Sequence, residues 1–271
     1  MINSNFKINF PSVIVLILGL LVGSALCWIL MFLFENYFQI DTARSGGFMM
    51  LTYAVSMIAP IVAFEIFIKK YQSKQLRFDF STKPFRVYLM VFPLMFGMML
   101  MSDVIVQQIP TDGDVFGPIY KMFQQQMSAL SFDNVSMIIL TVVMAPILEE
   151  ILFRGILQKG MINNGMKPWV AIIISSFIFG LIHGYPWQFV GAGLLGLVLG
   201  LVYHKTKSLL IVILLHAFNN LLSALFMMYS DVEHFSEILN MKNVYVFMLG
   251  LFVFAISFYF FAIKKNIVYK E

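Results

Sequence analysis

The sequence has few charged residues for its length. Asp, Glu, Lys and Arg make up 12% of the 271 residues, whereas a soluble globular domain carries about 25%. Hydrophobic residues account for 60%, and the mean hydropathy is +0.86. A water-soluble fold of this composition would leave large apolar areas exposed to solvent. Several apolar runs reach the roughly 20 residues that a helix needs to cross the hydrocarbon core of a bilayer, so we expect an integral membrane protein.

The sequence also lacks a second cysteine, which excludes an intrachain disulfide. Cys27 lies in the first apolar run, where we expect it to be a small packing residue. The formal net charge of +4 and the pI of 9.0 require no nucleic-acid partner, because membrane proteins collect Lys and Arg in their cytoplasmic loops. Composition therefore points to the lipid bilayer as a partner and to no nucleic acid.

Hydropathy along the chain predicts an all-α fold, a polytopic membrane bundle of about eight transmembrane helices. A further short helix is expected to lie along the membrane interface within the loop of about residues 110–135. No internal repeat, low-complexity tract or soluble domain is evident, so residues 1–271 are expected to form a single integral membrane domain. The predicted spans lie near residues 11–34, 47–68, 87–109, 136–162, 168–184, 187–203, 208–229 and 244–263.

Positively charged residues predict the orientation of this bundle. Cations crowd the loop between the second and third spans, and the positive-inside tendency places that loop in the cytoplasm. With eight spans, both termini then lie in the cytoplasm as well. Arg44, Lys121 and Lys242 are the cations that fall on the opposite side. The cations of the crowded loop and its borders are Lys69, Lys70, Lys74, Arg77, Lys83 and Arg86.

The fourth predicted span contains two carboxylates and a guanidinium, Glu149, Glu150 and Arg154. Each charged side chain at the bilayer centre costs roughly 2.5–3.5 kcal/mol on insertion scales, so such residues usually face the bundle interior and carry function. Adjacent helical positions point about 100° apart, so the two glutamates should have different roles. Glu150 and Arg154 have the i,i+4 spacing of a salt bridge. Glu149 has no partner on its own helix and is the candidate general base that activates water.

Two further spans supply histidines within apolar surroundings. Phe179 lies one turn before His183, and Asn220 lies one turn after His216. These i,i+4 spacings place each pair on one helix face, where the phenylalanine can hold His183 and where Asn220 can join His216 in binding an oxygen. Asn219 is expected to point elsewhere.

Helix geometry predicts that Glu149 and His183 lie at the same depth in the membrane. Both are nearly equidistant from a turn near residues 163–167, and an α-helix rises about 1.5 Å per residue. An antiparallel hairpin therefore brings the two side chains to one level. His216 can join them if the seventh span is tilted or displaced.

At these residues the chain resembles the CPBP family, which covers CAAX prenyl endopeptidases and bacteriocin-processing or abortive-infection proteins. The family pattern is EExxxR, then FxxxH, then HxxxN or HxxxB, each on a separate transmembrane helix. The resemblance extends over roughly residues 135–230, and the first three spans carry no matching motif. The motifs read here, in the family order, Glu149-Glu150-Ile151-Leu152-Phe153-Arg154, Phe179-Gly180-Leu181-Ile182-His183 and His216-Ala217-Phe218-Asn219-Asn220.

The resemblance implies an intramembrane endopeptidase with an all-helical fold. It implies that Glu149 and His183 together activate a water molecule. It also implies that His216 and Asn220 stabilise the oxyanion that forms when this water attacks a peptide carbonyl. These implied roles agree with the reading of the residues themselves.

Glu150 and Arg154 are implied to support the site or to bind a substrate terminus. The implied substrate is a protein or peptide, for which the family offers prenylated proteins and leader peptides as examples, and the sequence itself does not specify which. The implied location is the bacterial plasma membrane, with several membrane passes.

The residues leave three alternatives open. The family is often labelled as metalloproteases, and zinc could bind at Glu149, His183 and His216, although HExxH is absent. We favour a site that requires no cofactor. Buried Glu, Arg and His also mark proton-coupled transporters, and a catalytically silent scaffold or immunity protein could share the fold. A transporter would move ions across proteoliposomes, and the effect of a scaffold would survive Glu149→Ala.

Overall fold

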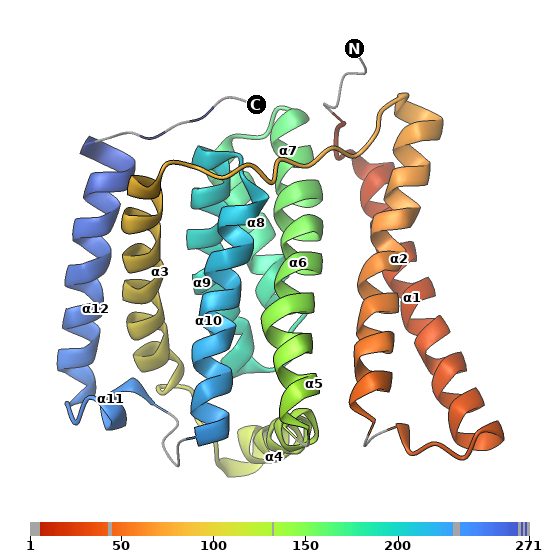
Figure 1. Ribbon diagram of the computed structural model, residues 1–271, viewed down its shortest axis with the longest axis horizontal. Helices are drawn as coiled ribbons and strands as arrows, with labels where there is room; N and C mark the ends of the chain where they lie inside the picture. The colour runs from red at the N-terminus through yellow and green to blue at the C-terminus, as the bar shows by residue number, and fades with distance from the viewer. Residues whose placement is uncertain are drawn as a thin grey trace.

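The computed structural model of the chain describes residues 6–42, 45–131, 133–229, 234–264, 267 and 269, and its described part is helical without a strand. In chain order the elements are α1 Phe10–Tyr37, α2 Gly46–Gln72, α3 Phe85–Val106, α4 Gly113–Leu130, α5 Asn134–Ile138, η2 Ile139–Met144, α6 Ala145–Glu150, η3 Ile151–Gln158, α7 Lys159–Asn163, α8 Pro168–Leu181, α9 Pro186–Thr206, α10 Leu209–Tyr229, α11 Phe235–Ile238, α12 Asn243–Phe258 and η4 Tyr259–Lys264. Its helices are shown in Figure 1, and short π-helical stretches continue directly from α5, α6 and α12.

The predicted all-α membrane bundle is confirmed. Seven helical segments within the described chain are long and apolar enough to cross a membrane. The predicted fifth span, α8, has 14 residues and a length of about 21 Å at 1.5 Å per residue. This is shorter than the roughly 30 Å of a bilayer core, so α8 falls short of a full crossing on its own. Helix α4 lies across one end of the bundle, as expected for the interfacial segment (Figure 1).

Residues 134–163 form one long helical span that departs from regular α geometry around the two glutamates. The π-helical stretches η2 and η3 lie on either side of α6, which is an α-helical segment of 6 residues. Pro146 lies in the first turn of α6, and because proline has no N–H group it removes one backbone hydrogen bond of the preceding turn. Wider π turns are frequent at functional sites. Here they lie directly before and after the segment that carries Glu149 and Glu150.

A tight hairpin joins α8 to α9 and sets the position of His183. Pro168 and Pro186 each lie in the first turn of a helix, where the missing N–H costs nothing. Gly184 has φ +80°, a left-handed conformation that favours glycine, and it reverses the chain between the two helices. At Gly180, an added Cβ would lie 2.5 Å from the Phe189 carbonyl oxygen. The two helices therefore pack backbone to backbone.

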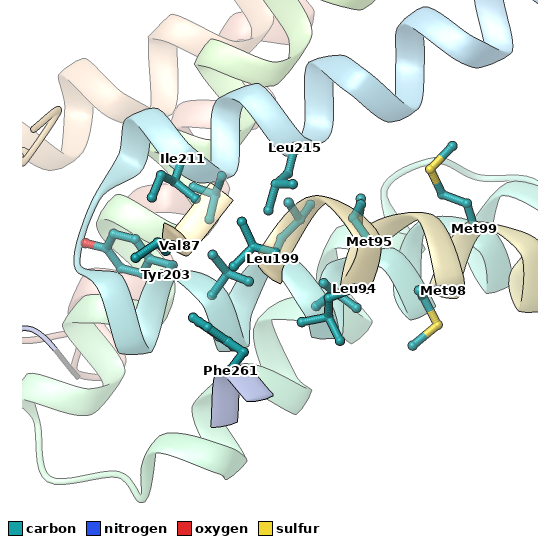
Figure 2. Close-up of a cluster of buried hydrophobic side chains, with 14 of the residues drawn as sticks. Val87, Leu94, Met95, Met98, Met99, Leu199, Tyr203, Ile211, Leu215 and Phe261 are labelled. Carbon is teal, nitrogen blue, oxygen red and sulfur yellow. The ribbon is translucent and has the colours of Figure 1, made fainter. Parts of the chain in front are cut away.

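Two hydrophobic clusters hold the bundle together. The larger cluster joins α3, α9, α10 and the C-terminal helix, and includes the fully buried side chains of Leu94, Met95 and Leu215 (Figure 2). The second joins the N-terminal segment and α2 to η3, through residues such as Phe64 and Ile156. The first cluster supports one wall of the cavity described below, and the second packs against the helix that continues beyond the glutamates.

Candidate active site

Glu150 and Arg154 form the predicted salt bridge at the centre of the bundle. Both side chains are fully buried, and Arg154 Nη1 donates to Glu150 Oε1 at 2.8 Å. Arg154 Nη2 donates to the Gly196 carbonyl oxygen at 3.0 Å, and the guanidinium carbon lies 4.6 Å from the centre of the Phe179 ring. Arg154 therefore ties its own span to both α8 and α9.

His216 lies between the two glutamates. Its Nδ1 atom donates to Glu150 Oε1 at 2.9 Å, and its Nε2 atom lies 3.7 Å from Glu149 Oε2. A carboxylate oxygen and an imidazole nitrogen without hydrogen are both acceptors, so a hydrogen donor between Nε2 and Oε2 would satisfy both. A water molecule or a proton on the ring can serve as this donor.

Tyr53 of α2 is a site residue that the sequence reasoning missed. Its hydroxyl donates a short hydrogen bond to Glu149 Oε1. Glu149 Oε2 is buried and has no hydrogen-bond partner within the described chain. The tyrosine thus occupies one carboxylate oxygen and leaves the other available. A tyrosine hydroxyl in the interior of an apolar helix is a sequence signal for a buried hydrogen bond. The first three spans contain no motif that would predict its partner.

Phe179 and His183 pack together as their spacing predicts. His183 Nδ1 donates to the Phe179 carbonyl oxygen at 2.7 Å, and the two ring centroids lie 5.0 Å apart. This hydrogen bond fixes the ring with Nε2 directed away from its own helix turn. His183 is half-buried, and the described contacts include no hydrogen bond or ion pair between His183 and Glu149. The two residues share the wall of one cavity.

Asn220 is held by two hydrogen bonds. Its Nδ2 atom donates to the Thr141 carbonyl oxygen at 2.8 Å, and its Oδ1 atom accepts from Asn219 Nδ2 at 2.9 Å. The expectation that Asn219 points elsewhere was wrong, because the side-chain amides bridge the angle between adjacent helical positions. Asn219 lines the same cavity as Asn220.

The three motif helices meet at one cavity of about 530 Å³. Glu149, His183, His216 and Asn220 all line it, together with Tyr53. Glu149 and His216 lie at its buried end, with exposed fractions of 6% and 5%. The fully buried Glu150 and Arg154 lie behind its wall and are not part of its lining. The cavity is large enough for a peptide segment and a water molecule.

The alternative with zinc places the metal at Glu149, His183 and His216, which all line this cavity. Among the side chains that the structure describes, no group of three or more His, Cys, Asp or Glu residues is placed to hold a metal ion. Glu150 Oε1 already accepts hydrogen bonds from both Arg154 and His216.

Comparisons with known proteins agree with the family resemblance. Residues 131–222 match the family model described as Type II CAAX prenyl endopeptidase Rce1-like, and this segment contains all three motifs. The chain is 29% identical over 143 residues to UPF0177 protein YaiF of Lactococcus lactis subsp. lactis (strain IL1403). The aligned region covers 49% of this chain and 62% of that relative. No solved structure matches the chain significantly. The resemblance seen in the motifs is confirmed.

Proposed function

We propose that this multi-pass membrane protein, with its Rce1-like segment at residues 131–222, is an intramembrane endopeptidase in which Glu149 activates water. The observation that carries the proposal is the buried, unpartnered Oε2 atom of Glu149, which faces His216 Nε2 across 3.7 Å at the wall of the cavity. A water molecule near this oxygen would be within reach of a base and beside an imidazole. This is the arrangement that general-base hydrolysis requires.

The proposed first step is attack by water on a peptide carbonyl. Glu149 Oε2 takes one proton from the water as the water oxygen bonds to the carbonyl carbon, and the carbonyl oxygen becomes an oxyanion. His183 presents its second ring nitrogen to the same cavity, where it orients the water. In the second step the carbon–nitrogen bond breaks, and the proton on Glu149 passes to the departing amine. The products are a carboxyl and an amino terminus.

His216 and Asn220 are the proposed oxyanion donors. A protonated His216 ring has an N–H group on each nitrogen, so Nδ1 can remain on Glu150 while Nε2 donates into the cavity. The amide nitrogen of Asn220 has two hydrogens, and only one is needed for the Thr141 carbonyl. Each residue therefore retains one donor for a developing negative charge, as an oxyanion hole requires.

Glu150 and Arg154 have a supporting role in this proposal. With His216 protonated, the formal charges of Glu149, Glu150, Arg154 and His216 sum to zero, which lowers the cost of burying them together. Because Glu150 and Arg154 lie outside the cavity lining, the geometry favours support of the site over recognition of a substrate terminus.

The decisive comparison is between the wild-type chain and Glu149→Gln, which keeps the shape of the side chain and the hydrogen bond from Tyr53. The N- and C-termini of all proteins are mapped in membranes that contain the wild-type chain or the variant. Termini that occur only with the wild-type chain mark its cleavage sites. Loss of a general base should slow cleavage by about 10²–10⁴-fold, so these termini should disappear. Glu35→Gln, at an exposed position on α1, is the matched control. Wild-type termini in the Glu149→Gln membranes would refute the proposal.

A further inference from the structure

The cavity has an exposed rim at one end of the bundle and a buried floor at the other. Its rim includes Gln126 on α4 and Ser223 and Met227 near the end of α10, which are all exposed. Its floor includes Met95 and Leu199, which are almost completely buried. Helix α4 lies at the end of the bundle opposite the loop between α2 and α3 (Figure 1). The cavity therefore opens at the end where α4 lies.

The other end of the same span is closed. Beyond Glu149, every residue from 152 to 161 is buried. The N-terminal segment covers this region: Phe6 and Ile8 belong to the same hydrophobic cluster as Phe153 and Ile156, and the Ile8 amide donates to the Gly160 carbonyl oxygen. A substrate cannot reach Glu149 from this end without unpacking the cluster.

The distribution of charge assigns these two ends to opposite sides of the membrane. The closed end carries a dense set of cations, whereas acidic residues predominate at the end where α4 lies, with Lys121 and Lys242 as its described cations. Arg44 lies outside the described residues. The positive-inside tendency places the cation-rich end in the cytoplasm. The cations at the closed end include Lys69, Lys70, Lys74, Arg77, Lys83 and Arg86.

The residues that line the cavity indicate which kind of polypeptide segment it can bind. Methionines from α2, α3, α4, α5 and α10 contribute to it, and methionine adapts to apolar groups of varied shape. The amides of Gln126, Gln188 and Asn219 also line it, and each can donate to and accept from a peptide backbone. Among the described lining residues there is no Lys, Arg or Asp, so nothing there would pair with a charged substrate side chain other than Glu149 and the histidines.

We infer that the cavity opens on the non-cytoplasmic side of the membrane and receives an uncharged, extended polypeptide segment presented there. This inference rests on the proposed function for the identity of the substrate as a peptide. The sidedness rests on packing and charge alone. A prenylated chain end in the cytoplasm would approach the closed face, so the substrate is expected to be an exported peptide or the outer part of a membrane protein.

Cysteine accessibility tests the sidedness without requiring activity. Because Cys27 is the single native cysteine, full-length Cys27→Ser is a background without other thiols. Gln126→Cys and Ser223→Cys place probes at the rim, and Lys74→Cys is the probe on the opposite side. Intact bacterial cells are treated with a membrane-impermeant maleimide before and after permeabilisation. We expect the rim cysteines to react in intact cells and Lys74→Cys to react only after permeabilisation.

Any other labelling pattern of correctly folded protein, judged by a single elution peak in detergent, overturns the inference. Ser223→Cys is nearly isosteric and provides a second measurement if Gln126→Cys fails to fold.

Mapping of the protein termini that appear only when Glu149 is present tests the substrate class. These termini should lie in non-cytoplasmic, uncharged segments. Termini in cytoplasmic segments would overturn the inference while supporting the peptidase. The absence of any such termini would refute the peptidase, and labelling would still decide the sidedness.

Discussion

Tyr53 on α2 donates a hydrogen bond to Glu149 on α6, although 96 positions separate the two residues in the chain. The contact brings α2 into the candidate site, outside the segment 131–222 that matches the family model. The candidate site therefore includes a helix that lies outside the three motifs.

Tyr53→Phe should preserve the fold and slow hydrolysis. The change removes one hydrogen bond to a charged group, worth about 1.5–3 kcal/mol, so the carboxylate of Glu149 can rotate away from the attacking water. We expect kcat/KM to fall by about ten- to a hundredfold, measured on any substrate found through the terminus mapping. Tyr71→Phe, on the same helix but 66% exposed, should leave the rate unchanged. Equal rates for Tyr53→Phe and Tyr71→Phe would show that the contact has no role in turnover.

Asn220→Ala should reduce turnover more than Asn219→Ala. Removing one oxyanion donor from a protease typically lowers kcat by about 10²–10³-fold. Asn219 lines the cavity and donates to Asn220 Oδ1, but the proposed mechanism gives it no contact with the oxyanion, so its loss should have the smaller effect. Single-turnover rates of the two variants provide the measurement. A larger loss of turnover for Asn219→Ala would show that the proposal gives the oxyanion role to the wrong asparagine.

Arg154→Met should destabilise the protein strongly. It leaves Glu150 buried without the guanidinium and with His216 as its polar contact within the described chain, and breaking a buried ion pair in this way costs about 3–5 kcal/mol. Adding Glu150→Gln to Arg154→Met removes the unpaired charge and should recover part of the loss. Thermal unfolding in detergent measures both variants.

The exposed pair Lys69 and Glu65 on α2 is the matched control for this experiment. It has the same i,i+4 spacing and an N–O distance of 3.1 Å, with 54% of the lysine side chain exposed. Lys69→Ala should therefore change stability by less than about 1 kcal/mol. If Arg154→Met melted like Lys69→Ala, the central role given to the buried pair would be wrong.

Gly180→Ala should disturb the site through the α8–α9 hairpin. Its new Cβ would lie 2.5 Å from a backbone oxygen of α9, and overpacking of this kind costs about 1–3 kcal/mol. Gly193→Ala is the control on the facing helix, because its nearest neighbouring atom would be 3.9 Å away. Melting temperature and hydrolysis rate should both fall for Gly180→Ala and should both remain near wild type for Gly193→Ala.

Dialysis against a strong chelator should leave cleavage unchanged. The proposed mechanism uses Glu149 as the base and His216 with Asn220 as the oxyanion donors, so no step depends on a metal. The measurement is the hydrolysis rate before dialysis, after dialysis and after addition of zinc. Loss of activity on dialysis with recovery on zinc addition would replace this mechanism by a metal-dependent one.

Hydropathy was sufficient to predict the helical bundle. The i,i+4 spacing was sufficient to predict the side-chain pairs within single helices. The Glu150–Arg154 salt bridge and the Phe179–His183 contact follow from helix geometry, and both are present. Interactions within one helix depend only on the number of residues between the partners. The cytoplasmic location of the termini and the division into a single domain stay predictions.

Contacts between helices were harder to predict. The Tyr53–Glu149 bond depends on how α2 packs beside α6, and neither helix encodes that packing in its own periodicity. The contacts of both His216 ring nitrogens with the two glutamates were not predicted either, and π turns such as those on either side of α6 rotate side chains relative to a regular α-helix. Rotation of this kind is invisible to a regular 3.6-residue period.

The complete burial of Glu150 and Arg154 affects how related sequences should be interpreted. Loss of either residue alone breaks their buried ion pair, which is costly, so related chains that do not hydrolyse peptides are still expected to retain both. Glu149 accepts a hydrogen bond from Tyr53 that a glutamine in its place could also accept, so we expect the bundle to tolerate this neutral replacement. We therefore expect the second acid and the arginine of the motif to indicate that a related chain has this fold, and, if the proposed mechanism holds, the first acid to indicate whether it can hydrolyse peptides.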